Sequence, residues 1–264
     1  MDYTLNVHGQ LLDLSRPLVM GILNATPDSF YADSRQQTEE DIAVCSRKIL
    51  AEGAAIIDVG GCSTRPGGEV VTEAEEMQRL RMALGVIRRE QPQAVVSVDT
   101  FRPDVARMAV EEFGADIIND VSGGTPEMFR MVTRLRVPYI LMSLQPTMRE
   151  MLLSFAEKVQ QLRDMGANDI ILDPGFGFGK TLEQNYEIMN ELEKLLVMEL
   201  PLLVGISRKS MIYRLFDCTP QEALNGTTTL DTIALMKGAS ILRVHDVKEA
   251  VECVSILHQL NCKL

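Results

Sequence analysis

The sequence predicts a single domain that folds as a (β/α)8 barrel of the TIM-barrel class, with a short β-hairpin ahead of the first barrel strand. Eight short apolar runs alternate with eight helical patterns, and nearly every run ends at a polar residue. The length of 264 residues suits such a barrel without long insertions. A flat doubly wound sheet is the alternative architecture, but eight repeats of strand and helix favour closure.

The expected strands are mostly apolar throughout and rich in Ile, Val and Leu, which is typical of parallel strands covered by helices on both faces. They run from Leu18 to Leu23, Ala55 to Val59, Ala94 to Val98, Asp116 to Ile118, Val137 to Met142, Asp169 to Leu172, Leu202 to Val204 and Ser240 to Val244. The helical patterns run from Thr38 to Glu52, Glu73 to Arg89, Pro103 to Phe113, Pro126 to Leu135, Met148 to Met165, Leu182 to Leu196, Pro220 to Lys237 and Lys248 to Leu260.

The polar residues at the strand ends predict one shared pocket, because the carboxyl ends of all strands in a closed parallel barrel meet at one mouth. They are Asn24, Asp58, Asp99, Asn119, Ser143, Asp173, Ser207 and Arg243.

Local signals mark the ends of these elements. Thr72 with Glu75 and Thr219 with Glu222 have the spacing of a capping box. A glycine that is followed by Ala and soon by Ile ends four helices, at Gly53, Gly114, Gly166 and Gly238, and in three cases a polar residue follows the glycine by five positions: Asp58, Asn119 and Arg243. Residues 1–15 alternate like a hairpin around His8, and we expect them to cap the floor of one barrel domain that spans residues 1–264.

Composition excludes several classes of protein. Five cysteines without a C-x-x-C spacing argue against a disulfide framework and a structural zinc site. The net charge of −11, without any arginine- or lysine-rich run, argues against a nucleic-acid partner. No signal peptide and no apolar run long enough to span a bilayer is recognisable, so we expect no membrane association and a cytoplasmic location.

The glycine-rich segment from Asp173 to Lys180 does not match a nucleotide-binding loop. A Walker A loop needs glycine six positions before its lysine, where Pro174 stands, and the glycine spacing does not fit G-x-G-x-x-G. Such a turn after a strand still lets the backbone approach a flat ligand closely. Asp173 is therefore either a ligand-binding carboxylate or a structural cap of its turn.

Asp99 and Asn119 end strands that are expected to point at the same mouth. Together with Asp173 they supply two carboxylates and one amide, which suit a ring edge rich in N–H donors. Each residue taken singly has a second interpretation as a helix cap, but the three together favour a binding site.

Cations cluster after the seventh and eighth strands, where barrels of this class frequently bind phosphate. Gly205 to Ser210 reads Gly-Ile-Ser-Arg-Lys-Ser, Arg243 to Asp246 reads Arg-Val-His-Asp, and Arg65 follows the second strand. These groups predict a diphosphate site. The alternatives are a surface salt bridge for Arg208 and a satisfied core histidine for His245.

Seven collinear motifs resemble the dihydropteroate synthases, folate-pathway enzymes of the pterin-binding family. The motifs, which span about Val19 to Val247, are Met20 to Phe30, Ile57 to Gly67, Ser97 to Thr100, Ile118 to Gly123, Asp173 to Lys180, Ser207 to Ser210 and Arg243 to Val247. The resemblance implies a (β/α)8 barrel and a transferase that joins 4-aminobenzoate to (7,8-dihydropterin-6-yl)methyl diphosphate, with release of diphosphate. It also implies inhibition by sulfonamides and a homodimer.

Roles for individual residues follow from the same resemblance. Asp99, Asn119, Asp173 and Lys209 are expected to hold the pterin, and Arg243 to cover its ring. Asn24 is expected to bind Mg²⁺, with Thr64, Arg65, Arg243 and His245 near the diphosphate. Ser210 and Lys209 are expected to seat the aminobenzoate, flanked by Phe30. Lys209, Asp99, Arg243 and His245 are the expected catalytic groups, and the chain offers no obvious protein nucleophile.

The sequence departs from the family pattern mainly after the fifth strand. The family commonly reads His-Met there, followed by a Gly-Thr-Pro turn and a long loop, whereas Met142 to Met148 lacks the histidine and runs almost directly into a helix. Cys62 and Ala25 stand where the family usually has Glu and Val. One alternative function is a methyltetrahydrofolate:corrinoid methyltransferase, which shares the barrel and the pterin carboxylates. A second alternative, indicated by the shortened loop, is a non-catalytic pterin-binding protein.

Overall fold

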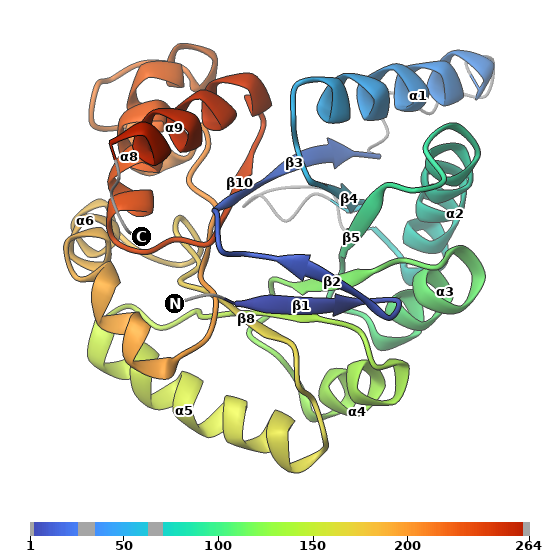
Figure 1. Cartoon of the computed structure of the whole chain (residues 1–264), viewed down its shortest axis with the longest axis horizontal. Helices are drawn as coiled ribbons and strands as arrows, with labels where there is room; N and C mark the ends of the chain where they lie inside the picture. Colours follow the sequence, from blue (N-terminus) through green and yellow to red (C-terminus); the bar gives the residue numbers. More distant parts are fainter. Residues whose placement is uncertain (1–2, 26–34, 63–70, 261–264) are drawn as a thin grey trace.

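Eight parallel strands form the barrel in the computed structural model, which describes residues 3–25, 35–62 and 71–260 (Figure 1). They are β3 (Leu18–Asn24), β4 (Ile56–Gly60), β5 (Val95–Asp99), β6 (Ile117–Asp120), β7 (Tyr139–Met142), β8 (Ile170–Asp173), β9 (Leu203–Val204) and β10 (Ile241–Val244). The order is β8-β7-β6-β5-β4-β3-β10-β9, and a parallel bridge between Leu172 and Leu202 joins the two outer strands. The predicted barrel is therefore confirmed.

Helices cover the outside of this sheet (Figure 1). They are α1 (Arg35–Ala51), α2 (Glu73–Glu90), α3 (Pro103–Phe113), α4 (Pro126–Leu135), α5 (Met148–Asp164), α6 (Leu182–Asn190), α7 (Ser210–Tyr213), α8 (Leu224–Met236) and α9 (Val247–Gln259). Short 3₁₀ helices, η3 (Leu192–Met198) and η4 (Pro220–Glu222), follow α6 and precede α8. Two helices predicted as continuous are thus divided, because each contains a tight turn that apolar periodicity does not reveal.

The predicted end signals work as expected. The Thr72 side chain accepts a hydrogen bond from the Glu75 amide, and Thr219 with Glu222 forms a reciprocal capping box. Gly114 ends α3 in the left-handed conformation, and the three other glycines of the repeat also have positive φ.

The floor of the barrel is apolar and includes the N-terminal hairpin, β1 (Thr4–Val7) and β2 (Gln10–Asp13). Leu5 and Val7 join a buried cluster with inward-facing residues of the barrel strands: Met20, Ile56, Ile117, Ile140, Ile171, Leu203 and Ile241. A second, larger core packs the outer face of the strands against the helices. The hairpin therefore shields the amino end of the barrel from water.

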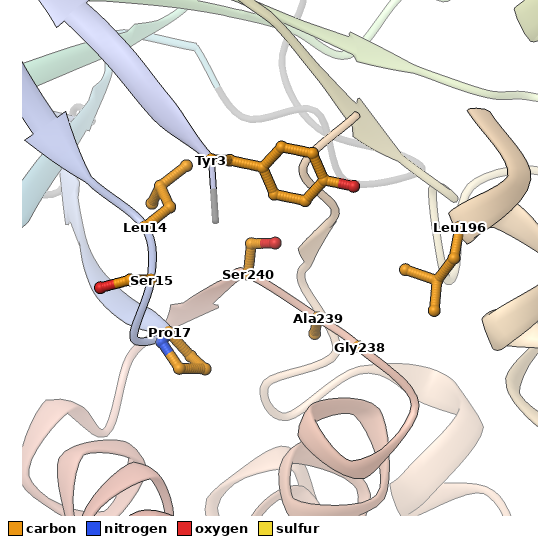
Figure 2. Close-up of a pocket in the computed structure, with 8 residues that line it drawn as sticks. All are labelled: Tyr3, Leu14, Ser15, Pro17, Leu196, Gly238, Ala239 and Ser240. Carbon is orange, nitrogen blue, oxygen red and sulfur yellow. The ribbon is translucent and has the colours of Figure 1, made fainter. Parts of the chain in front are cut away.

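A small cavity of about 200 Å³ lies beside this hairpin, lined by Tyr3, Leu14, Pro17, Leu196 and the segment 238–240 (Figure 2). Gly238 to Ser240 precede β10, so the cavity is at the amino ends of the strands. Active sites of (β/α)8 barrels form at the opposite, carboxyl end. The carboxyl end is therefore the expected place of the functional site.

Candidate active site at the carboxyl ends of the strands

A layer of polar side chains lies directly above the apolar floor. Side chains two positions apart on a strand point to the same side, so the residue two positions after each floor residue also faces the interior. On β4, β6, β8 and β10 this residue is Asp58, Asn119, Asp173 and Arg243. The first three are at most 5% exposed. The barrel thus brings together polar groups that are up to 185 positions apart in the sequence.

Arg243 is held between two carboxylates. Its Nε donates to Asp58 Oδ2 at 2.6 Å, and its Nη2 donates to Asp99 Oδ2 at 2.7 Å. Asn119 Nδ2 donates to the same Asp58 oxygen at 3.2 Å. This set, Asp58, Asp99, Asn119 and Arg243, is called the arginine cluster below. It places two carboxylates around one guanidinium, so the cluster carries one excess negative charge when both carboxylates are ionised.

Burial and charge shift the pKa values in the arginine cluster. Burial raises the pKa of Asp99 to about 7; Arg243 opposes this shift, whereas Asp58, Glu76 and Asp120 add to it. Burial disfavours the charged form of Arg243, but its pKa is nevertheless raised, because Asp58 and Asp99 stabilise the cation. Asp99 is therefore poised to exchange a proton near neutral pH.

Asp173 and Lys209 lie beside the glycine-rich loop and interact electrostatically. Asp173 Oδ1 accepts a hydrogen bond from the Gly175 amide at 2.7 Å. Lys209 Nζ donates to Phe176 O at 2.6 Å and lies 4.6 Å from the centre of the Phe178 ring. Burial raises the pKa of Asp173 and lowers that of Lys209 to about 8, and each residue favours the charged form of the other.

Lys180 joins the loop after β8 to the end of β7. Its Nζ donates to Ser143 O and to Gly175 O, each at 2.9 Å. Burial lowers the pKa of Lys180 to about 8, whereas the negative charge of Asp173 favours its protonation. The sequence motif included this lysine, but no role was predicted for it.

The cations after β9 and β10 have different surroundings. His245 is exposed, and its Nδ1 lies 3.3 Å from Ser207 Oγ. Arg208 instead forms two hydrogen bonds to Asp246, both at 2.8 Å, and two further ones to Pro220 O and Gln221 O. The salt-bridge alternative for Arg208 is thus correct, and its contribution to a diphosphate site is not supported, because its donors are engaged. Ser210 begins α7 next to Lys209 and is half-buried.

Asn24 is exposed at the carboxyl end of β3, opposite Gly60 of β4. Among residues 3–25, 35–62 and 71–260, no three His, Cys, Asp or Glu side chains form a group that could hold a metal ion. An amide oxygen is nevertheless a ligand that suits Mg²⁺, which usually binds through one or two protein groups together with phosphate oxygens and water. The donor set at Asn24 therefore fits Mg²⁺ that arrives with a diphosphate. Phe30, Thr64 and Arg65, also predicted for this mouth, lie outside the described residues.

Asp58 is the residue of the arginine cluster for which sequence analysis gave no role. The signal was present, because Asp58, Asn119 and Arg243 share the same position after a helix-ending glycine. The three residues with this shared register are the ones that the structure joins by hydrogen bonds.

A barrel with acidic and basic groups converging at the carboxyl ends of its strands defines a class of enzyme that binds a polar small molecule. The sequence profile of the family described as pterin binding enzyme matches residues 20–245. The chain belongs to this family.

Relatives within the family share nearly the whole chain. Dihydropteroate synthase of Escherichia coli K12 is 40% identical over 94% of this chain and 93% of its own length. Dihydropteroate synthase of Bacillus subtilis 168 is 37% identical over 97% and 94%. The solved structure of Xanthomonas albilineans dihydropteroate synthase with 4-aminobenzoic acid superimposes with a TM-score of 0.90 at 35% identity and covers 98% of both chains. The Yersinia pestis enzyme with a pterine-sulfa conjugate gives 0.87 at 36% identity, covering 98% of this chain and 99% of the other.

Proposed function

We propose that the protein is a dihydropteroate synthase, a transferase that joins 4-aminobenzoate to (7,8-dihydropterin-6-yl)methyl diphosphate in folate biosynthesis. The observation that carries this proposal is the convergence of the arginine cluster and the Asp173–Lys209 pair above one barrel floor, in a chain whose relatives are dihydropteroate synthases. Two similar solved structures are complexes with 4-aminobenzoic acid and with a pterine-sulfa conjugate, which supports the choice of both substrates.

In this reaction the amine nitrogen forms a bond to the methylene carbon, the bond from that carbon to the diphosphate oxygen breaks, and the amine loses a proton. We assign the pterin to Asp99, Asn119, Asp173 and Lys209. Carboxylates and an amide oxygen accept hydrogen bonds from the N–H groups of such a ring. Negative charge around the pterin also stabilises the positive methylene that develops as the diphosphate leaves.

The departing diphosphate needs positive charge. We assign this role to Arg243 and His245 of the described residues, together with Thr64 and Arg65. Asn24 would hold Mg²⁺, which supplies positive charge to the diphosphate oxygens when it is bound. Ser210 and Lys209 would seat the aminobenzoate, with Phe30 beside its ring. Because the amine attacks as a neutral base, the protein mainly positions it and excludes water.

The decisive experiment mixes purified protein with the pterin diphosphate, 4-aminobenzoate and Mg²⁺ and measures diphosphate release. Release that depends on the amine supports a synthase. Tight pterin binding without turnover would instead identify the non-catalytic alternative. Methyl transfer from methyltetrahydrofolate to a corrinoid would identify the methyltransferase.

The proposal extends to assembly and location. One domain over residues 1–264 is supported by the single sheet that contains all eight barrel strands. A homodimer is supported by exposed apolar side chains on the C-terminal helices, such as Met236 and Ile256, and light scattering tests it. No described helix is sufficiently long and apolar to traverse a bilayer. The expected cytoplasmic location is tested by cell fractionation.

A further inference from the structure

Asp58 occupies the centre of the arginine cluster although no substrate contact is assigned to it. It is fully buried on β4, and one of its carboxylate oxygens accepts hydrogen bonds from both Arg243 and Asn119. These donors come from β10 and β6, on either side of β4 in the sheet. A single carboxylate thus ties together two residues to which the proposed function gives direct substrate contacts.

The contact with Asp58 fixes which way the Asn119 amide points. An ionised carboxylate has no proton to donate and therefore acts only as a hydrogen-bond acceptor. The Nδ2 group of Asn119, which is a donor, must then face Asp58. The Asn119 Oδ1 atom then points elsewhere, and it is buried without a hydrogen-bond partner in the part of the chain that the structure describes. A buried acceptor without a partner suits an N–H donor supplied by a ligand.

The contact with Arg243 fixes the plane of the guanidinium. Asp58 receives Nε and Asp99 receives Nη2, so two carboxylates on different strands hold the group from two sides. Loss of either carboxylate would leave the guanidinium with one anchor and freedom to rotate about its side-chain bonds. An arginine expected to lie over a flat ring needs its orientation fixed in this way.

We propose that Asp58 is a positioning residue for the transferase reaction: its carboxylate orients Asn119 and Arg243 toward the pterin and sets the negative charge beside Asp99. This inference rests on the proposed function and adds a residue that acts through others. The negative charge of Asp58 also affects the protonation of Asp99. Asp58 of β4 faces Asp99 together with Arg243 of β10, Glu76 of α2 and Asp120 of β6, and its negative charge contributes to the raised pKa of Asp99.

The test is Asp58→Asn, which keeps the size of the side chain and removes its charge. Arg243 and Asp99 remain as a balanced pair, so the barrel is expected to fold. The KM for the pterin diphosphate should rise roughly 10- to 100-fold, the factor expected for losing hydrogen bonds to a charged group, while the KM for 4-aminobenzoate changes little. The acid limb of the pH profile should move to lower pH, because Asp99 loses a negative neighbour.

Asp116→Asn is the matched control. Asp116 is a buried aspartate at the opposite end of the barrel, where it accepts hydrogen bonds from Arg88 at 2.9 Å and from the Val96 amide at 2.7 Å. Its substitution should lower the melting temperature but leave both KM values and the pH profile unchanged. Equal changes in the two variants would overturn the proposal, since they would indicate a general loss of structure.

Asp58→Glu separates geometry from charge and provides a second test where Asp58→Asn does not fold. The longer side chain keeps the charge but displaces the two donors, so the KM for the pterin diphosphate should rise while the acid limb stays in place. A wild-type KM in a folded Asp58→Asn or Asp58→Glu variant would contradict a positioning role. The wild-type protein is measured in the same assay, so a failure of the proposed function appears as absent wild-type turnover and is distinct from a failure of this inference.

Discussion

Gly175 offers the sharpest test of how the loop after β8 supports the site. Its φ is +69°, a region that residues with a Cβ rarely adopt. A Cβ atom there would meet Ser143 O far inside any real contact distance and would lie 2.9 Å from Met142 Cγ, whereas ordinary contact begins at 3.4 Å. In Gly175→Ala, either the loop after β8 or the segment at the end of β7 must therefore move by roughly 0.5–1 Å.

The displacement should affect stability and activity together. The left-handed conformation costs about 1–2 kcal/mol, and the overpacking adds about 1–3 kcal/mol. For a protein of this size the sum corresponds to a melting temperature lowered by roughly 4–20 °C. The Gly175 amide donates to Asp173 and the Gly175 carbonyl accepts from Lys180, so both contacts shift. A displacement on the order of 1 Å near reacting groups lowers kcat/KM by about 10²-fold.

Gly179 provides a control within the same loop. Its φ is +65°, but nothing lies within 4 Å of an added Cβ. Gly179→Ala should therefore show only the conformational cost of about 1–2 kcal/mol and a nearly normal kcat/KM. Differential scanning fluorimetry and the diphosphate-release assay give both quantities for each variant. Equal kcat/KM values for the two alanine variants would refute the reasoning, because the clash with Ser143 would then have no effect on the site.

Three further predictions use the same assay. Lys209→Ala and Asp173→Ala should each abolish turnover, by at least about 10²-fold in kcat/KM, without unfolding the barrel by circular dichroism; wild-type rates in either variant would contradict the assignment. The pH profile of kcat/KM should be bell-shaped: activity falls below about 7 as Asp99 takes up a proton and above about 8 as Lys209 loses one. A flat profile from pH 6 to 9 would exclude these roles. Sulfonamides should raise the apparent KM for 4-aminobenzoate, and rates that do not respond to them would argue against the proposed amine subsite.

The fold was predictable because the strands carry their signal locally. Most barrel strands are apolar runs that contain, or are directly followed by, a polar residue, and the observed strands agree with the predicted ones to within two residues. Helix ends were predictable where capping chemistry is explicit, as at Thr219 and Gly114. The division of two predicted helices was not predictable, because the apolar pattern continues through the turn, as it does between η4 and α8.

The sequence predicted which residues belong to the site, but not which of their side chains contact one another. Sequence order places Asp99, Asn119, Asp173 and Arg243 at strand ends, yet it cannot tell which side chains meet across the barrel. Arg208 and Lys209 illustrate this limit, because these adjacent cations of one motif bind different partners. Arg208 has φ of +54° and pairs with Asp246, whereas the Lys209 side chain reaches Phe176. The direction of each side chain thus depends on a partner that is distant in the sequence, 38 positions away for Arg208 and 33 positions away for Lys209.

The shortened segment after β7 bears on whether the barrel is catalytic. The backbone of Ser143, directly after β7, is tied to the site: its amide donates to Asp173 O at 2.8 Å and its carbonyl accepts from Lys180. Thr147 then caps α5 by accepting from the Glu150 amide. In the described part of the chain, the hydrogen bonds of Arg243 and Lys209 go to partners on β4, β5 and the loop after β8, and none goes to β7. Among the described residues, the Arg243 and Lys209 side chains are therefore held without hydrogen bonds to β7, whereas Lys180 binds the carbonyl of Ser143 directly after it.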